Sequence, residues 1–192
     1  PPVGTTNERP ENPQPGDLRF NTDSASLEYY RGDTIGWEQI EMKEAAPIGA
    51  RGLAMGGYNP TNLNTIEYIE IATTGNAKDF GDLTETVDTA AVASSTTRAV
   101  RHGGYDGSGN SDVQDYVQIA TLGNAVSFSD TLNSFRNRAA CGDSTRGIWM
   151  GGFSTTDEIS YITFSSTGTD IDFGNLTASR YNTAGLSSST RG

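Results

Sequence analysis

The sequence predicts an all-β protein built from many short strands joined by tight turns. Apolar residues make up only 34% of the 192 residues, and 23 residues are glycine. Ser and Thr are also frequent, a composition that suits strands and turns. No long apolar stripe recurs at helical spacing, which argues against helices. The strongest indication is an internal repeat that carries strand-like segments at fixed intervals.

Three segments open with Arg and run through apolar residues into a Gly-Gly pair and an aromatic residue. The interval from Arg51 to Arg98 is 47 residues, from Arg98 to Arg146 it is 48, and Arg191 follows 45 residues later. Self-similarity at a fixed period is the signature of stacked repeats. The Gly-Gly pairs are Gly56 and Gly57, Gly103 and Gly104, and Gly151 and Gly152.

The later part of each copy keeps the same register. A Tyr is followed by a Gly seven residues on, and by a Phe five residues after that Gly. Only the segment between the Gly-Gly pair and the Tyr varies in length, which is typical of a surface loop. These landmarks are Tyr68, Tyr116 and Tyr161, and Phe80, Phe128 and Phe173.

Each copy can hold four strands. The second strand alternates, so that one face carries Ile69 and Ile71 in the first copy, Val117 and Ile119 in the second, and Ile162 and Phe164 in the third. The Gly-Gly pair is expected to supply positive φ angles or a close backbone approach. In the first copy the predicted strands are 53–55, 66–72, a short one around Phe80, and 91–93. The equivalent of 91–93 in the third copy is Ala184–Leu186.

The period lies within the range of β-propeller blades. The landmarks resemble kelch-like repeats, with Phe in place of Trp at the later aromatic position. The resemblance implies three four-stranded blades, residues 51–97, 98–145 and 146–190, and the start of a fourth. A ring needs about four to eight blades, so either the natural chain continues beyond Gly192 or subunits pool their blades. A trimeric β-structure of three wound chains is the alternative.

Residues 1–43 do not share the period and form a separate module, joined to the repeats by a linker at 44–50. A Pro-rich lead precedes three short strands in which Leu18 alternates with Phe20, and Leu27 with Tyr29. So few strand residues cannot bury a core alone. The module is therefore expected to pack against a partner copy or another chain.

Residues 4–40 carry the pattern Gly-Thr-Thr, Arg-Pro, Pro-x-x-Gly, Arg-Phe-Asn-Thr, Leu-Glu-x-Tyr, Gly and Trp. This pattern resembles a short module of bacteriophage tail-fibre and other virion proteins. The resemblance implies a homotrimeric appendage, assembled in the host cytoplasm, that contacts other virion proteins and turns its distal domains toward the host.

The net charge is −11. Such a surface argues against binding nucleic acid or anionic membranes, where Lys and Arg must neutralise phosphates. No apolar run approaches the roughly 18 residues of a membrane span. Membrane insertion is not expected.

The candidate binding residues lie in the variable loops. Aromatic rings can stack on a sugar, and Asn and Asp side chains can hydrogen-bond to it, although the same residues are ordinary in loops. They would bind a glycan or protein of the host surface. The candidates are Tyr58, Asn59, Asn62, Tyr105, Asp106, Asn110 and Phe153.

No catalytic, metal or cofactor site is predicted. His102, the only His, stands where the other copies have Met55 and Met150, so we interpret it as a partly buried spacer. Cys141 is interpreted as a small buried residue. Residues 106–112 resemble a calcium-binding loop in part, but we interpret them as a solvated turn. The repeated Arg residues are interpreted as structural, forming either an ion pair or a strand-end hydrogen bond to neighbouring carbonyls. A ring of cations around a central channel is the alternative.

These observations give three hypotheses. The first is a non-enzymatic structural protein of the virion, a tail-fibre or other appendage subunit that binds the host surface. The second is a capsid, neck or tail decoration protein with a purely architectural role. The third is a carbohydrate-binding kelch-type protein.

Overall fold

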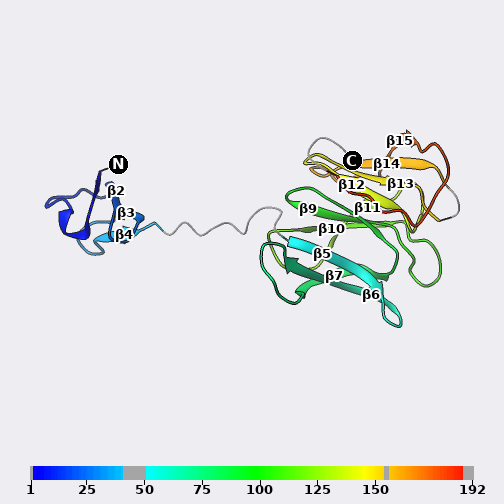
Figure 1. Cartoon of the computed structure of the whole chain (residues 1–192), viewed down its shortest axis with the longest axis horizontal. Coiled ribbons are helices and arrows are strands. Elements are labelled where there is room, and N and C mark those ends of the chain that lie inside the picture. Colours follow the sequence, from blue (N-terminus) through cyan, green and yellow to red (C-terminus); the bar gives the residue numbers. More distant parts are fainter. Residues whose placement is uncertain (1, 41–50, 154–155, 188–192) are drawn as a thin grey trace. The chain divides into compact units, whose positions relative to one another are not determined.

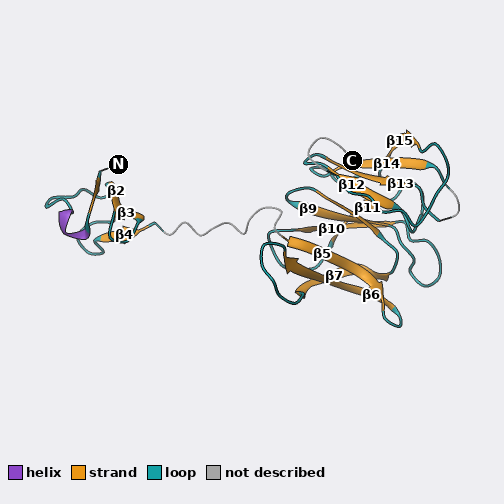
Figure 2. Cartoon of the chain, in the orientation of Figure 1, coloured by secondary structure: helices purple, strands orange, loops and turns teal. Residues whose placement is uncertain are grey.

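The structure, a computed structural model, describes residues 2–40, 51–153 and 156–187. The chain divides into two compact units, Pro1–Ala45 and Ala46–Gly192. Within the described residues the regular elements are strands, apart from the three-residue 3-10 helix η1 (Thr6–Glu8) (Figure 2). No helix in this part of the chain has the length and hydropathy needed to cross a membrane. The expected all-β fold is confirmed. The linker predicted at 44–50 lies outside the described residues.

The first unit is a single four-stranded sheet in the order β1-β2-β3-β4. Three of its strands are those expected, and β1 is an addition that pairs in parallel with β2. β1 therefore lies at the start of the Pro-rich lead, for which no strand was predicted. The strands are β1 (Val3–Gly4), β2 (Leu18–Asn21), β3 (Ser26–Tyr30) and β4 (Trp37–Gln39).

The covered face of this sheet is polar and centred on a buried carboxylate. Glu28 is 0% exposed and forms ion pairs with Arg9 (2.7 Å) and Arg19 (3.4 Å). The hydrogen bonds from Arg9 hold the pKa of Glu28 below its usual value. The opposite face carries the apolar residues: strand pairing sets Leu18 beside Tyr29, and Phe20 beside Leu27. Leu18 is 49% exposed, so this unit keeps its apolar side at its surface.

The second unit consists of three antiparallel sheets that lie one above another (Figure 1). They form an open stack in the described residues. The first sheet contains β5 (Arg51–Tyr58), β6 (Asn62–Glu70) and β7 (Lys78–Val87). The second contains β8 (Ala91–Ser94), β9 (Arg98–His102), β10 (Val113–Gln118) and β11 (Val126–Asp130). The third contains β12 (Ala139–Gly142), β13 (Arg146–Met150), β14 (Glu158–Thr163) and β15 (Ile171–Asn175).

The sheets do not coincide with the sequence repeats, which corrects the boundaries at 97/98 and 145/146. The predicted fourth strand of each copy pairs with the first strand of the next copy, as β8 does with β9 and β12 with β13. The cause is the short turn between them, which Ser95 closes by donating its N–H to the Arg98 carbonyl (2.9 Å). The predicted strand 184–186 is not formed. By analogy its partner would begin at Arg191, outside the described residues.

The Gly-Gly pairs have the geometry that the sequence predicts. All six residues have positive φ angles, from 54° at Gly103 to 145° at Gly152. A Cβ atom at the first Gly of each pair would lie 2.3–2.6 Å from a carbonyl oxygen, which for Gly103 is that of Phe135. Only glycine meets both requirements.

Each boundary between sheets is a small apolar core. Tyr68 and Phe80 of the first sheet share a cluster with Val117 and Ile119 of the second. Phe128 of the second sheet shares an equivalent cluster with the third sheet, in the residues Trp149, Ile162 and Phe164. The alternation predicted for β10 and β14 is thus confirmed.

The repeated Arg residues tie adjacent sheets together. Arg51 stacks over the Tyr68 ring (4.8 Å) and donates from Nη1 to the Ile119 carbonyl of the next sheet (2.7 Å). Arg98 stacks over the Tyr116 ring in the same way and donates to the Phe164 carbonyl (2.6 Å). These bonds confirm the interpretation of Arg51 and Arg98 as donors to neighbouring carbonyls. Arg191 lies outside the described residues.

Candidate functional site: a pocket at the loop edge

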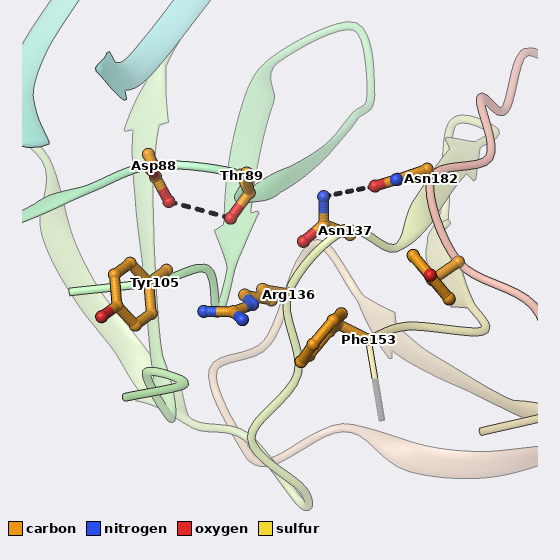
Figure 3. A pocket seen from close by; sticks show the side chains of 8 residues that line it. Asp88, Thr89, Tyr105, Arg136, Asn137, Phe153 and Asn182 are labelled. Atoms are coloured by element: carbon orange, nitrogen blue, oxygen red, sulfur yellow. Dashed lines mark hydrogen bonds between the residues drawn. The ribbon is translucent and has the colours of Figure 1, made fainter. Parts of the chain in front are cut away.

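A pocket of about 250 Å³ lies where the loops that follow two of the Gly-Gly pairs meet the segments that lead away from β7, β11 and β15 (Figure 3). Equivalent positions of successive copies line it, so it is a product of the stacking. Its residues are Asp88, Thr89, Tyr105, Arg136, Asn137, Phe153, Tyr181 and Asn182.

The floor of the pocket consists of three residues, one from each copy of the repeat, that have a left-handed backbone conformation. Thr89, Asn137 and Asn182 have φ angles of 49°, 57° and 55° and occupy the same place in the three copies. Asn137 donates its N–H to the Thr89 carbonyl (2.9 Å), and Asn182 donates to the Asn137 carbonyl (3.1 Å). Asn tolerates this conformation better than most residues, because its short side chain hydrogen-bonds locally. The floor is therefore a fixed feature of the fold.

Arg136 is the centre of the pocket. Its guanidinium lies 4.5 Å from the centroid of the Tyr105 ring and 4.2 Å from that of the Phe153 ring (Figure 3). Phe153 in turn meets Tyr181 edge to face at 5.5 Å. The backbone holds this arrangement, since Phe153 donates its N–H to the Arg136 carbonyl (2.8 Å).

This arrangement leaves the polar edge of the guanidinium available. The aromatic rings cover its faces, and its side chain makes no hydrogen bond to a described residue. An Arg held by stacking presents in-plane N–H donors suited to carboxylate, phosphate or paired hydroxyl oxygens. Asp88, which accepts from the Thr89 hydroxyl, and the Asn137 and Asn182 amides of the floor, which bond to each other, add further acceptors and donors. The pocket can therefore bind a small polar ligand that also offers a face for stacking.

The predicted loop residues have different fates. Tyr105 and Phe153 come together in the pocket. Tyr58, at the equivalent position of the first copy, is 67% exposed and does not line it. Asn59 is likewise exposed, and Asn62 and Asn110 donate from their side chains to the backbone carbonyls of Tyr105 (2.7 Å) and Ser134 (3.1 Å).

Asp106 has the role of a turn residue. Its carboxylate accepts the N–H groups of Ser108 (2.6 Å) and Gly109 (2.8 Å), and these bonds hold the pKa of Asp106 below its usual value. An Asp that bonds its own backbone in this way stabilises a turn. In the described part of the chain, no group of three His, Cys, Asp or Glu residues is arranged to hold a metal ion.

Sequence reasoning missed most of the pocket, including Asp88, Arg136 and Tyr181. These three stand ten residues before Arg98, Arg146 and Arg191, so the repeat itself marks the position. Their side chains differ in charge and size. Because the three residues are not alike, the shared landmarks of the repeat do not reveal this position.

No protein-family model matches the chain, and no curated protein matches its sequence. The site is accordingly interpreted from its own geometry.

A buried ion pair supports the pocket from the interior. Arg101 and Asp115 are both 0% exposed and form two hydrogen bonds of 2.9 Å each. Arg101 also donates to Glu85 of the first sheet (2.8 Å) and to the Gly103 carbonyl (2.9 Å). Burial alone would lower the pKa of Arg101, but its two carboxylate partners raise it. Both residues of the pair belong to the second sheet. The bond from Arg101 to Glu85 joins that sheet to the first, beside the Gly-Gly turn that leads to Tyr105.

A second polar group joins the second and third sheets. His102 is 1% exposed, so it is fully buried and not partly buried as expected. Its Nε2 lies 3.4 Å from Asp170 and 3.3 Å from Arg138, and Nδ1 has no hydrogen-bond partner among the described residues. Burial, with the positive charge of Arg138, holds the pKa of His102 below its usual value. Burial raises and the hydrogen bonds from His102 and Ser160 lower the pKa of Asp170, to a net value of about 2.

Cys141 matches its interpretation as a small buried residue, with an exposed fraction of 7%. Burial raises the pKa of its thiol. A thiol that stays protonated is a poor nucleophile and a poor metal ligand. Cys141 therefore belongs to the packing of β12 against its neighbours.

Proposed function

We propose that this chain is a structural subunit of a bacteriophage appendage that binds a glycan of the host surface in the pocket around Arg136. The observation that carries the proposal is the Arg136 side chain held between Tyr105 and Phe153 beside Asp88. Stacking surfaces next to polar groups with open hydrogen-bonding capacity suit a sugar ring, which has apolar faces and a rim of hydroxyls. A sugar that carries a carboxylate would gain a charge-assisted bond to Arg136.

The assignment to a virion rests on the residues of the N-terminal module. Their pattern resembles that of phage fibre proteins, and the exposed apolar face with Leu18 and Phe20 suits attachment to another virion subunit. The repeats would then be the part presented to the host. A single small pocket gives weak binding, but many copies on one particle add avidity without further contacts.

The test is binding of the full chain to a panel of oligosaccharides from bacterial O-antigens and capsules, followed by titration of the glycans that bind. Arg136→Ala is expected to weaken binding at least about tenfold, because a hydrogen bond to a charged group contributes about 1.5–3 kcal/mol. Tyr105→Ala should also weaken it. Tyr58→Ala is the matched control, since Tyr58 has the same position in the repeat but lies outside the pocket.

Three results would contradict the proposal. If no glycan of the panel binds, or if Arg136→Ala binds as tightly as the unchanged chain, the pocket is not a glycan site. If mass spectrometry of purified phage particles never finds the chain, the assignment to a virion is wrong even where a glycan binds.

A further inference from the structure

The outer face of the first sheet has the residues of a boundary between sheets but no sheet covering it. Ile69 on β6 and Ile71 just after it are 46% and 63% exposed. Their equivalents at the end of β10, Val117 and Ile119, are 3% and 6% exposed, and those at the end of β14, Ile162 and Phe164, are both 3% exposed. The difference arises because the second and third sheets each have a preceding sheet to pack against.

The far face of the third sheet shows the complementary difference. Phe80 and Phe128 are 3% and 4% exposed, whereas Phe173 at the same position is 52% exposed. The exposed ring is nevertheless held in the geometry of a boundary. Phe173 meets Tyr161 edge to face at 5.9 Å, and the two preceding sheets have the same pair at 6.0 Å and 5.9 Å.

The outer faces of the first and third sheets also carry residues equivalent to those that form polar contacts at the two boundaries. Arg146 stacks over Tyr161 at 4.8 Å, as Arg51 and Arg98 do over their own Tyr. Both of those Arg residues donate to the carbonyl of the residue equivalent to Ile71 in the next sheet. Arg146 is thus placed to donate to Ile71 of a sheet stacked upon it.

The donor of a second polar contact also holds the same position at both boundaries, whereas the carboxylates that accept it, Asp115 and Asp170, are not equivalent in the repeat. The residue four places after each landmark Phe donates its N–H to a carboxylate of the next sheet: Thr84 to Asp115 (3.0 Å) and Leu132 to Asp170 (2.6 Å). Thr177 holds this position in the third sheet and is exposed. On the outer face of the first sheet, Glu67 is the counterpart of Asp115 and is also exposed.

The first sheet offers space for an incoming aromatic ring. A hollow of about 220 Å³ lies on it, lined in part by the small residues Gly52, Ala54 and Ala77 and by Ile69. Phe80 and Phe128 each pack on the equivalents of Ile69 and Ile71 in the sheet that follows. Phe173 is the side chain of that kind which lacks such a surface within its own chain.

We infer that the third sheet of one copy stacks on the first sheet of a second copy, and that two copies close head to tail into a ring of six sheets. The occupant is a second copy because the two exposed faces are the two halves of a contact that the chain already makes twice. Contacts between unlike faces must close into a ring or extend as a filament. Two copies give six sheets, within the range of about four to eight that closes. This inference is independent of the pocket and differs from the trimer that the N-terminal resemblance implies.

The test is the mass of the full chain in solution, by sedimentation or light scattering at micromolar concentrations. The expected mass is twice the 20.4 kDa of one chain. Ile71→Asp and Phe173→Asp are each expected to give monomers, because each places a charge in both contacts of the ring. Both residues are more than half exposed within one chain, so circular dichroism should show folded protein. Leu122→Asp, at a 56% exposed residue between β10 and β11, is the matched control and should remain a dimer.

Mixing the two variants distinguishes unlike from like faces. One copy with Ile71→Asp and one with Phe173→Asp retain a single unaltered contact, so the mixture is expected to form a one-to-one complex. A contact between two identical faces would instead leave one of the variants dimeric on its own. A monomeric or trimeric unchanged chain, or a dimer that both variants preserve, would overturn the inference.

Discussion

Replacing Asp115 by Asn is expected to lower the free energy of unfolding of the second unit by about 3–5 kcal/mol, since it leaves the Arg101 charge buried without its counter-charge. Asp115 accepts two hydrogen bonds from Arg101 and also the N–H and hydroxyl of Thr84 across the sheet boundary. The measurement is urea denaturation followed by Trp149 fluorescence in a Trp37→Phe background, so that only the second unit is observed.

Two further variants separate charge from packing. Arg101→Met combined with Asp115→Asn removes both charges and is expected to be more stable than Asp115→Asn alone. Glu70→Gln, in the same unit, removes a carboxylate from the more exposed pair with Arg51 (3.4 Å) and should change stability much less. If Asp115→Asn lowers the free energy of unfolding by less than about 1 kcal/mol, the pair contributes no more than an exposed surface pair does. That result would contradict its role in joining the sheets.

Replacing Gly103 by Ala is expected to cost at least about 2 kcal/mol. The left-handed conformation costs an L-residue about 1–2 kcal/mol. The added Cβ would lie 2.3 Å from the Phe135 carbonyl oxygen, which must move away from the Gly104 N–H that it accepts, at a cost of about 1 kcal/mol. Urea denaturation of the same kind measures the change.

The matched control for this change is Gly75→Ala. A Cβ at Gly75 meets no atom within 4 Å and the residue does not have a positive φ angle. The substitution should be neutral or slightly stabilising, because it reduces the freedom of the unfolded chain. Equal effects at Gly103 and Gly75 would show that the Gly-Gly turn is not constrained as described.

The periodic features of the fold could be predicted from the sequence, and the grouping of strands into sheets could not. Fixed intervals indicated which residues are equivalent, and alternation indicated which faces are buried, as at Val117 and Ile119. The strand β8 is separated by similarly short segments from β7 before it and from β9 after it. Its partner is set by the turn at Ser95, whose hydroxyl accepts the N–H groups of Thr97 and Arg98. Because the sequence contains many Ser-rich segments, this turn could not be recognised from its residues alone.

The pocket was only partly predictable for a related reason. Its aromatic residues Tyr105 and Phe153 belong to the repeat pattern and were found with it. Arg136 was not, because its counterparts are Asp88 and Tyr181, and only the folded chain sets its guanidinium between two rings. The first unit was also only partly predictable, because its polar face is covered and its apolar face is exposed. Alternation identified the two faces but did not indicate which of them would be covered.

The stacking of equivalent faces at both boundaries is the claim on which the pocket, the ring of six sheets and the stability predictions depend. Nuclear Overhauser contacts between side chains in the isotope-labelled protein test it directly. Contacts are expected between Phe128 and Ile162 or Phe164, and at the other boundary between Phe80 and Val117 or Ile119. Spectra in which Phe80 and Phe128 contact only residues of their own sheets would contradict the stacking.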